Sequence, residues 1–154
     1  MKKSIYIMEH EREADRLILQ VDAEALIEKN VSTIINKHTK HQIFGKQRLL
    51  EAGCGPGHLT EAIAKKYPKL NIVGVDTSER RLSVARIRLG NYKRIELKNE
   101  DITCLKEESN RFDFVFSRFV LEHIKSQQLK AVSEFYRILK PGGVLILQSV
   151  DQGL

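Results

Sequence analysis

The stretch from Arg48 to Gly57, RLLEAGCGPG, limits the fold of this chain more than any other part of it. It starts as an apolar run typical of a buried strand and ends in glycines at alternate positions, which are Gly53, Gly55 and Gly57. Apolar residues then recur at helical spacing, so the loop joins a strand to a helix. Glycine permits a positive φ and a close approach to a ligand, and the helix start offers free N–H groups. The stretch therefore predicts the first crossover of a doubly wound sheet, where nucleotide-like ligands bind.

The spacing of the glycines separates two kinds of ligand. Dinucleotide-binding loops carry G-x-G-x-x-G, but this chain has His58 at the sixth position and its third glycine one residue earlier. Glu51, two residues before the first glycine, adds an acid at the end of the strand. An acid at this place favours a ligand that carries positive charge over a pyrophosphate. The alternative is a strand–turn–helix corner whose glycines serve only the turn.

Strands alternate with helices along the chain, which predicts an α/β fold with a mainly parallel sheet. The expected strands are Arg48–Ala52, Asn71–Asp76, Ile95–Asn99, Phe112–Ser117 and Val144–Leu147. The expected helices are Met8–His38 in one piece or two, His58–Tyr67, Glu79–Leu89 with a cap at Thr77 or Ser78, and Ser126–Leu139. The last helix is expected to turn inward Leu129, Val132, Phe135, Tyr136 and Leu139. The KPGG segment that follows reads as a tight turn.

Composition points to one globular domain. A chain of 154 residues can bury one core but not two, and 42% hydrophobic with 30% charged residues excludes a disordered chain. No apolar run approaches the length of a membrane span, and the N-terminal apolar run is too short for a signal peptide. We therefore expect a cytoplasmic protein with no membrane partner. Cys54 and Cys104 have no zinc-binding spacing, so we expect free thiols and no metal site.

The net charge of +6 would attract phosphates. The basic residues are scattered, however, over predicted helix faces and loops. No aromatic residues are interleaved with them, as a base-stacking surface would require. A solvated surface explains these residues better than a nucleic-acid site does, so nucleic acid is not favoured as a partner.

Five motifs, in order from Glu51 to Leu147, resemble those of class I S-adenosylmethionine (SAM)-dependent methyltransferases. They are E-x-G-x-G-x-G from Glu51, the acid Asp76, N-E-D-I from Asn99, F-D-F-V-F-S-R-F-V-L-E-H-I from Phe112 and R-I-L-K-P-G-G from Arg137. The resemblance implies a sheet of about five strands in the order 3-2-1-4-5 with helices on both faces. It also implies SAM as the cofactor and S-adenosylhomocysteine as the product. The Asn/Asp-Pro-Pro-Tyr signature of enzymes that methylate amino groups of nucleic acids is absent, because the fourth strand ends in F-S-R.

The resemblance also implies a set of cofactor-binding residues. They are Glu51, Gly53, Cys54, Gly55, Gly57, Asp76, Thr77, Asp101, Ile102, Ser117 and Arg118. Asp76 would accept hydrogen bonds from the ribose hydroxyls, and it can also cap the next helix. Asp101 would accept from the adenine amino group with Ile102 packed on the ring; the alternative is that Asp101 is only a solvated loop acid. Ser117 and Arg118 would face the methionine end of the cofactor and the acceptor.

No catalytic residue is fixed by the resemblance. Methyl transfer from a sulfonium needs alignment above all, and a base only where the acceptor must lose a proton. Arg118 and His123 are the candidates, and His123 fits a helix-start residue better than a general base. We expect a small-molecule acceptor. The alternatives are a non-catalytic SAM-binding or scaffold protein and, disfavoured by the glycine spacing, an NAD-dependent oxidoreductase.

The chain ends soon after the fifth strand, whereas members of the resembled family carry two more strands. We expect residues 1–47 to form an N-terminal helical segment that packs on the sheet or closes over the cofactor. Residues 48–154 are expected to form a SAM-binding core that lacks the last two strands. Val144–Leu147 would then be an apolar edge strand without proline or charge, which natural proteins avoid. We expect another copy or another chain to cover this edge.

Overall fold

The structure is a computed structural model that describes residues 31–40 and 44–149. Its strands are β1 (Arg48–Ala52), β2 (Asn71–Asp76), β3 (Ile95–Asn99), β4 (Phe112–Arg118) and β5 (Leu139–Gln148). Its helices are α3 (Ser32–Thr39), α4 (His58–Lys66), α5 (Glu79–Leu89), the 3₁₀ helix η3 (Leu121–Gln127) and α6 (Gln128–Ile138). The first three predicted strands are confirmed residue for residue, and the fourth is one residue longer than predicted.

All five strands are parallel and pair in the order β3-β2-β1-β4-β5, which confirms the predicted topology. β1 lies at the centre, and its last residue, Ala52, lies opposite Val75 of β2 and Ser117 of β4. The segments that follow these three strands therefore start side by side at the carboxyl edge of the sheet. In open α/β sheets this edge, where the strand order reverses, is the place at which ligands bind.

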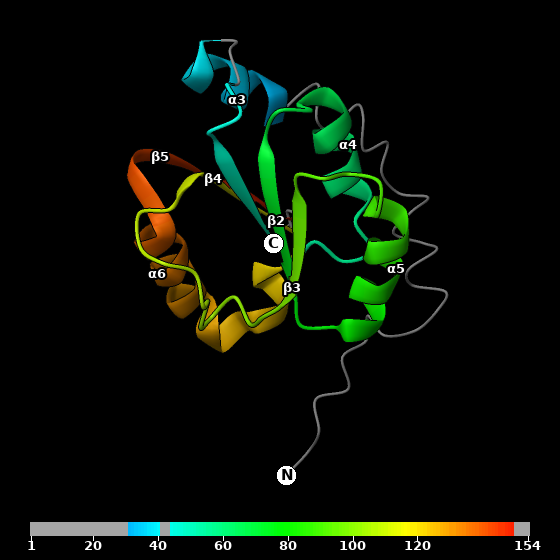
Figure 1. The fold of residues 1–154 in the computed structure, drawn as a ribbon. Coiled ribbons are helices and arrows are strands. Elements are labelled where there is room, and N and C mark those ends of the chain that lie inside the picture. The colour runs from blue at the N-terminus through cyan, green and yellow to red at the C-terminus, as the bar shows by residue number, and fades with distance from the viewer. Residues whose placement is uncertain (1–30, 41–43, 150–154) are drawn as a thin grey trace.

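Helices cover both faces of the sheet, with α3, α4 and α5 on one side and α6 on the other (Figure 1). Successive strand residues point to opposite faces, so the two halves of the core alternate along β1. Leu49 packs with Ile35 of α3 and Ile63 of α4, whereas Leu50 packs with Phe135 of α6. Strands buried on both sides must be apolar at every position, which is why they read as continuous apolar runs.

α6 turns a different face to the sheet from the one predicted. The predicted inward positions of Leu129 and Tyr136 are wrong, because these side chains are 87% and 82% exposed. The buried positions of the helix are Ala131, Phe135 and Ile138. α6 begins at Gln128, directly after η3. The apolar periodicity did not predict η3. The orientation of α6 about its own axis was therefore predicted wrongly.

β5 begins five residues earlier than predicted. Leu139, predicted as the last inward residue of the helix, instead pairs with Phe112 as the first residue of β5. The predicted tight turn is a bulge, since the strand register shifts between the Leu139 and Val144 pairs. Gly142 has a φ of +79° within the bulge. Proline and glycine mark an irregularity inside this edge strand rather than its boundary.

β5 forms one edge of the sheet, and no strand in the described ranges pairs with its outer side. Leu147 is 46% exposed near the carboxyl end of β5. The expectation that another copy or chain covers this edge stays a prediction.

α3 is the described part of the predicted N-terminal segment, and it packs into the core. Ile35 and Val31, the residue before α3, are fully buried, and the hydroxyl of Tyr67, the residue after α4, donates to Asn36 Oδ1 at 3.1 Å. The predicted closure of the segment over the cofactor concerns residues 1–30, which lie outside the described residues. Within the ranges that the structure describes, no helix has both the length and the apolar character needed to cross a membrane.

The rotation of α6 can be tested with two adjacent aromatic residues. Phe135 is fully buried, so Phe135→Ala should lower the free energy of unfolding by about 3–5 kcal/mol through lost burial and a residual cavity. Tyr136 is mostly solvated, so Tyr136→Ala should change it by no more than about 0.5 kcal/mol. Urea unfolding of both variants measures the difference. Equal losses would contradict the observed orientation of the helix.

Candidate functional site

The loop after β1 is a tight turn held by backbone hydrogen bonds. The N–H groups of Gly53 and Cys54 both donate to the Val75 carbonyl of β2, at 2.8 and 3.0 Å. Gly57 N then donates to the Cys54 carbonyl at 3.1 Å, and its own carbonyl accepts the first helical bond of α4 from Glu61 N at 2.9 Å. The loop is thus fixed to the end of β2 before the helix begins.

The three glycines of the loop have positive φ values, but their surroundings differ. A Cβ on Gly53 would lie 2.3 Å from Val120 Cγ2, and a Cβ on Gly57 would lie 2.8 Å from Leu89 Cδ1. Both glycines therefore allow close packing within the protein. A Cβ on Gly55 would meet no atom of residues 31–40 and 44–149 within 4 Å. Gly55 is the position at which the loop presents bare backbone to open space.

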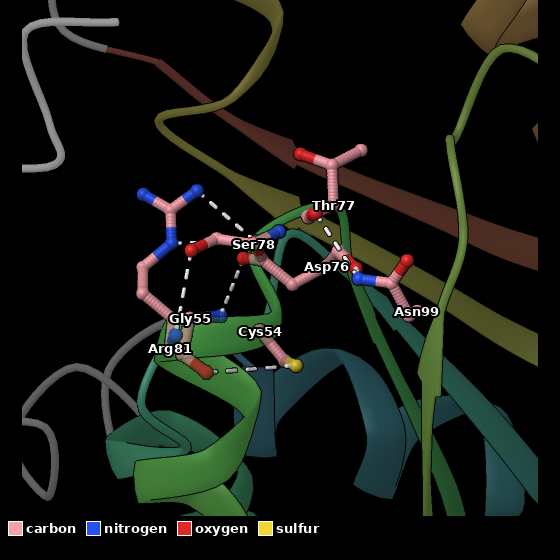
Figure 2. Close-up of polar contacts among 7 residues, drawn as sticks. All are labelled: Cys54, Gly55, Asp76, Thr77, Ser78, Arg81 and Asn99. Carbon is pink, nitrogen blue, oxygen red and sulfur yellow. Dashed lines mark hydrogen bonds and ion pairs between the residues drawn. The ribbon is translucent and has the colours of Figure 1, made fainter.

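The carboxylate of Asp76, at the end of β2, organises the neighbouring backbone (Figure 2). It is 5% exposed, and its Oδ2 accepts from Gly55 N at 2.9 Å. Its Oδ1 accepts from Ser78 N at 2.8 Å. Ser78 is the N-cap of α5, because its side chain accepts from Arg81 N. One carboxylate therefore links the glycine loop of β1 to the start of the helix after β2, as a cap and as a potential ligand group together.

Arg81, on the first turn of α5, forms an ion pair with Asp76 that the sequence analysis missed. Its Nη2 and Nε atoms lie 3.0 and 3.3 Å from Asp76 Oδ1, and Figure 2 shows the guanidinium folded back toward the carboxylate. The Arg81 side chain is 18% exposed. Arg81 follows Asp76 by five residues, on the first turn of the next helix, and this position could have predicted the ion pair. Arg81 was instead counted among the scattered basic residues.

Glu51 is a second buried acid at this edge of the sheet. It is 4% exposed, and its Oε2 accepts from Thr60 Oγ1 of α4 at 2.7 Å. Burial raises the pKa of Glu51 from 4.5 to about 7; the Thr60 bond and Arg118 lower the pKa, whereas Asp76 raises it. A carboxyl group in this position gains stability from any cation brought close to it.

The exit from β4 packs on the glycine loop and carries polar atoms without partners. Phe119 has a φ of +52°, uncommon for a bulky residue, and its N–H donates to the Gln148 carbonyl at 2.9 Å. Arg118 lies over the Phe119 ring at 4.2 Å, and burial lowers the pKa of its guanidinium while Glu51 raises it. Arg118 Nε and Ser117 Oγ are buried without a hydrogen-bond partner among the described residues. Such atoms are uncommon in folded proteins and point to a binding surface.

Cys54 and Thr77 are two further residues that the sequence predicted for the cofactor site. The Cys54 side chain is buried over Gly74, and burial, with Glu51 and Asp76, raises the pKa of its thiol. Thr77 is exposed, and its carbonyl accepts from Asn99 Nδ2 at 3.0 Å. Burial therefore disfavours the thiolate form of Cys54, and Thr77 is held by its backbone.

Asp101, Ile102 and His123 lie on the loops that follow β3 and β4. Asp101 Oδ1 accepts from both Thr103 N and Thr103 Oγ1 at 2.8 Å, so its carboxylate is engaged within its own turn. Ile102 is 6% exposed in the core that faces α6. His123 is exposed in η3, and its N–H donates to the Val120 carbonyl at 3.0 Å, consistent with a residue that fixes the start of this helix.

Arg88 of α5 holds the glycine loop from outside, and the sequence analysis missed this as well. Its Nε donates to the Pro56 carbonyl and its Nη1 to Glu61, each at 3.2 Å. Its Nη2 lies 3.2 Å from His58 Nε2, and burial and Arg88 lower the pKa of that imidazole. Three groups of the loop and α4 are therefore positioned by one side chain.

Together these features can hold a ligand that offers a cation and hydrogen-bond donors. Glu51 and Asp76 supply buried acceptors, Gly55 supplies an open backbone surface, and Arg118 supplies a buried donor. A pyrophosphate would instead meet two acids, which supports the distinction drawn from the glycine spacing.

Comparison with known proteins gives a consistent result. The family described as "Methyltransferase domain" matches residues 49–143. Trans-aconitate 2-methyltransferase of Variovorax paradoxus (strain S110) is 34% identical over 104 residues, which are 68% of this chain and 39% of that protein.

Solved structures agree with the sequence relatives. Phosphoethanolamine N-methyltransferase 2 of Haemonchus contortus, solved with S-adenosyl-L-methionine, has a TM-score of 0.64 and 34% identity over 75% of this chain and 26% of that one. The [4+2]-cyclase SpnF has a TM-score of 0.65 and 27% identity over 88% of this chain and 44% of that one. The chain thus spans less than half of each of these three proteins.

The match to residues 49–143 covers more than half of the chain, and the strand order and glycine loop agree with it. The chain belongs to the methyltransferase domain family, within the class I SAM-dependent methyltransferases.

Proposed function

We propose that this chain binds SAM at the carboxyl ends of β1, β2 and β4 and transfers its methyl group to a small-molecule acceptor. The observation that carries the proposal is Gly55: its backbone faces open space while its N–H donates to the buried carboxylate of Asp76. Bare backbone beside an acid suits a nucleoside whose ribose carries two hydroxyl donors. When bound, SAM supplies a methyl group already activated by a sulfonium.

The residues of the chain divide the binding among them. Asp76 accepts from the ribose, and Glu51 faces the cationic amino-acid end of the cofactor. Arg118, with its unpartnered Nε, donates to the carboxylate of the cofactor. Asp101 and Ile102 stay proposed adenine contacts, for which Asp101 would keep its second oxygen. The chain then acts mainly by alignment, because a sulfonium needs little further activation.

Only the chemical class of the methyl acceptor, a small molecule, is proposed. The curated relative is named for trans-aconitate and the solved one for phosphoethanolamine, both small molecules. The second candidate is a SAM-binding chain that does not transfer methyl groups. The likeness to SpnF, a cyclase by its title, favours keeping this candidate. A transfer assay with a panel of acceptors separates the two.

Calorimetry with SAM, S-adenosylhomocysteine and NAD in parallel tests the proposal itself. Binding of SAM and S-adenosylhomocysteine, with no binding of NAD, supports the proposal. Binding of NAD alone would revive the oxidoreductase reading.

Gly55 can be tested against a glycine with the same backbone requirement elsewhere. Gly55 and Gly142 both have positive φ, and a Cβ on either would meet no atom within 4 Å. Alanine at each should lower the free energy of unfolding by about 1–2 kcal/mol. Only Gly55→Ala should also weaken SAM binding, by more than about tenfold, because its methyl group occupies the cofactor surface. Equal SAM affinities in the two folded variants would separate this loop from the ligand.

Asp113, near the amino end of β4, serves as a matched control for Asp76, which lies at the carboxyl end of β2. Asp76→Ala should weaken SAM binding by about 10- to 150-fold, the expected loss of charge-assisted hydrogen bonds. Asp113 accepts from Arg48 N at 2.8 Å and pairs with Lys140, so it resembles Asp76 in its structural bonds. Asp113→Ala should lower stability and leave SAM affinity unchanged. A folded Asp76→Ala variant with unchanged affinity would remove Asp76 from the site.

Glu51 predicts a pH dependence of cofactor binding. The pKa of about 7 means that the free protein holds a proton on Glu51 over much of the range below 7. A cation beside Glu51 favours the ionised form, so binding releases this proton. SAM affinity should rise by up to about 20-fold from pH 5.5 to 7.5. Calorimetry in buffers of different ionisation enthalpy measures the released proton.

Glu51→Gln is the control, since it keeps the size of the side chain and cannot titrate. Its SAM affinity should be lower at pH 7.5 and nearly flat over the same range. A wild-type profile as flat as that of Glu51→Gln would place the cationic end of the cofactor elsewhere.

A further inference from the structure

A cleft of about 540 Å³ lies beside the proposed cofactor site, between the end of β4, η3, the start of α6 and the end of β5. Its lining includes Ser117, Glu122, Lys125 and Leu147. Ser117 lies opposite Ala52, the last residue before the glycine loop, on one side and opposite Leu147 on the other. The cleft therefore adjoins the place where the methyl group would be presented, with room for a small molecule.

Two buried polar atoms of the lining have no hydrogen-bond partner within the part of the chain that the structure describes. Ser117 is 2% exposed, and its Oγ makes no hydrogen bond. Glu122 Oε2 is likewise buried without a hydrogen-bond partner. A buried carboxylate oxygen without a donor costs free energy, so its retention calls for an explanation. Both atoms can accept, and the group that would satisfy them is a hydrogen-bond donor, best of all a cationic one.

The rim of the cleft has the opposite charge. Lys125 lies three residues after Glu122 in η3, beyond a kink at Ile124; it is exposed and also lines the cleft. Gln128 also lines the cleft, but its side chain is held within the protein, because its Nε2 donates to the Leu121 carbonyl at 2.9 Å. The cleft therefore has an acidic group with one buried oxygen and a basic, solvated group, and Leu121 and Leu147 add apolar surface to its lining.

From this arrangement we infer that the cleft binds a small zwitterion, with its amino group on Glu122 and Ser117 and its acidic group toward Lys125. The assignment of this molecule as the methyl acceptor rests on the proposed function. Its binding to the cleft does not, because the groups that hold it belong to β4 and η3 and are present without a cofactor.

Three probes of matched length test the charge pattern: 4-aminobutyrate, butylamine and butyrate. Each is titrated into the isotope-labelled full chain without cofactor, and affinities are read from backbone amide shifts at residues 117–128 and 147–149. 4-Aminobutyrate should bind most tightly, butylamine next and butyrate least. Butyrate binding as tightly as the two amines, or shifts that lie outside these residues, would overturn the inference.

Two pairs of variants locate the charges. Glu122→Gln should weaken both amine probes by about tenfold or more and leave butyrate unchanged. Glu108→Gln makes the same charge change on an exposed loop residue and should change nothing. Lys125→Met should lower the affinity for 4-aminobutyrate toward the affinity for butylamine. Lys130→Met, on the exposed surface of α6, should not lower it. Equal effects within either pair would mean that only net charge matters.

The outcome is separable from that of the proposed function. SAM calorimetry on the same protein reports the cofactor site, and the probe titration reports the cleft. SAM binding without the probe pattern overturns the zwitterion site alone. The probe pattern without SAM binding keeps the site and overturns its role as a methyl acceptor site.

Discussion

The burial of both faces of a parallel sheet is the constraint on which the rest of this structure depends. Leu49 and Leu50, adjacent in β1, are both fully buried, one toward α4 and the other toward α6. Such strands have no solvated face on which polar side chains can lie. Polar chemistry is therefore confined to the ends of the strands, and the crossovers bring the ends of β1, β2 and β4 together. The candidate site is where the core stops.

The two buried acids at that edge are balanced to different degrees. Asp76 pairs with Arg81. Among the described residues, Glu51 has Thr60 as its hydrogen-bond partner and Arg118 as a nearby cation that does not pair with it directly. Burial outweighs both effects and raises the pKa of Glu51, so this carboxyl group lacks a directly paired cation. A ligand with an ammonium group supplies what Glu51 lacks, and bare backbone at Gly55 leaves room for it.

The sequence predicted those parts of the structure that local patterns encode. Buried strands appear as apolar runs, and the turn after β1 appears as alternate glycines, so β1, β2 and β3 were placed to the residue. The phase of α6 was missed because Leu129 and Tyr136 have helical spacing but lie on the solvent side. Whether an apolar stripe is covered depends on elements far away in the sequence.

Arg88, which holds the glycine loop, was missed for the same reason: it reaches a carbonyl 32 residues earlier in the chain and leaves no local pattern. Arg81 differs, because it lies only five residues after Asp76, and this local signal was overlooked. By contrast, Asp76 was found because an acid after a buried strand is itself a local signal.

The Arg81 ion pair also bears on how a nucleoside can bind. A carboxylate has about four lone-pair sites. Oδ1 of Asp76 already faces Ser78 N and two guanidinium nitrogens, whereas Oδ2 accepts from Gly55 N alone among the described residues. In the proposed complex, one ribose hydroxyl would bind at Oδ2 without rearrangement, but a second at Oδ1 would require the guanidinium to move. Displacing the guanidinium would exchange one set of charge-assisted bonds for another, so ribose binding as proposed would add less to affinity than a count of new bonds suggests. The proposed selectivity of this edge would consequently depend as much on Arg81 as on Asp76.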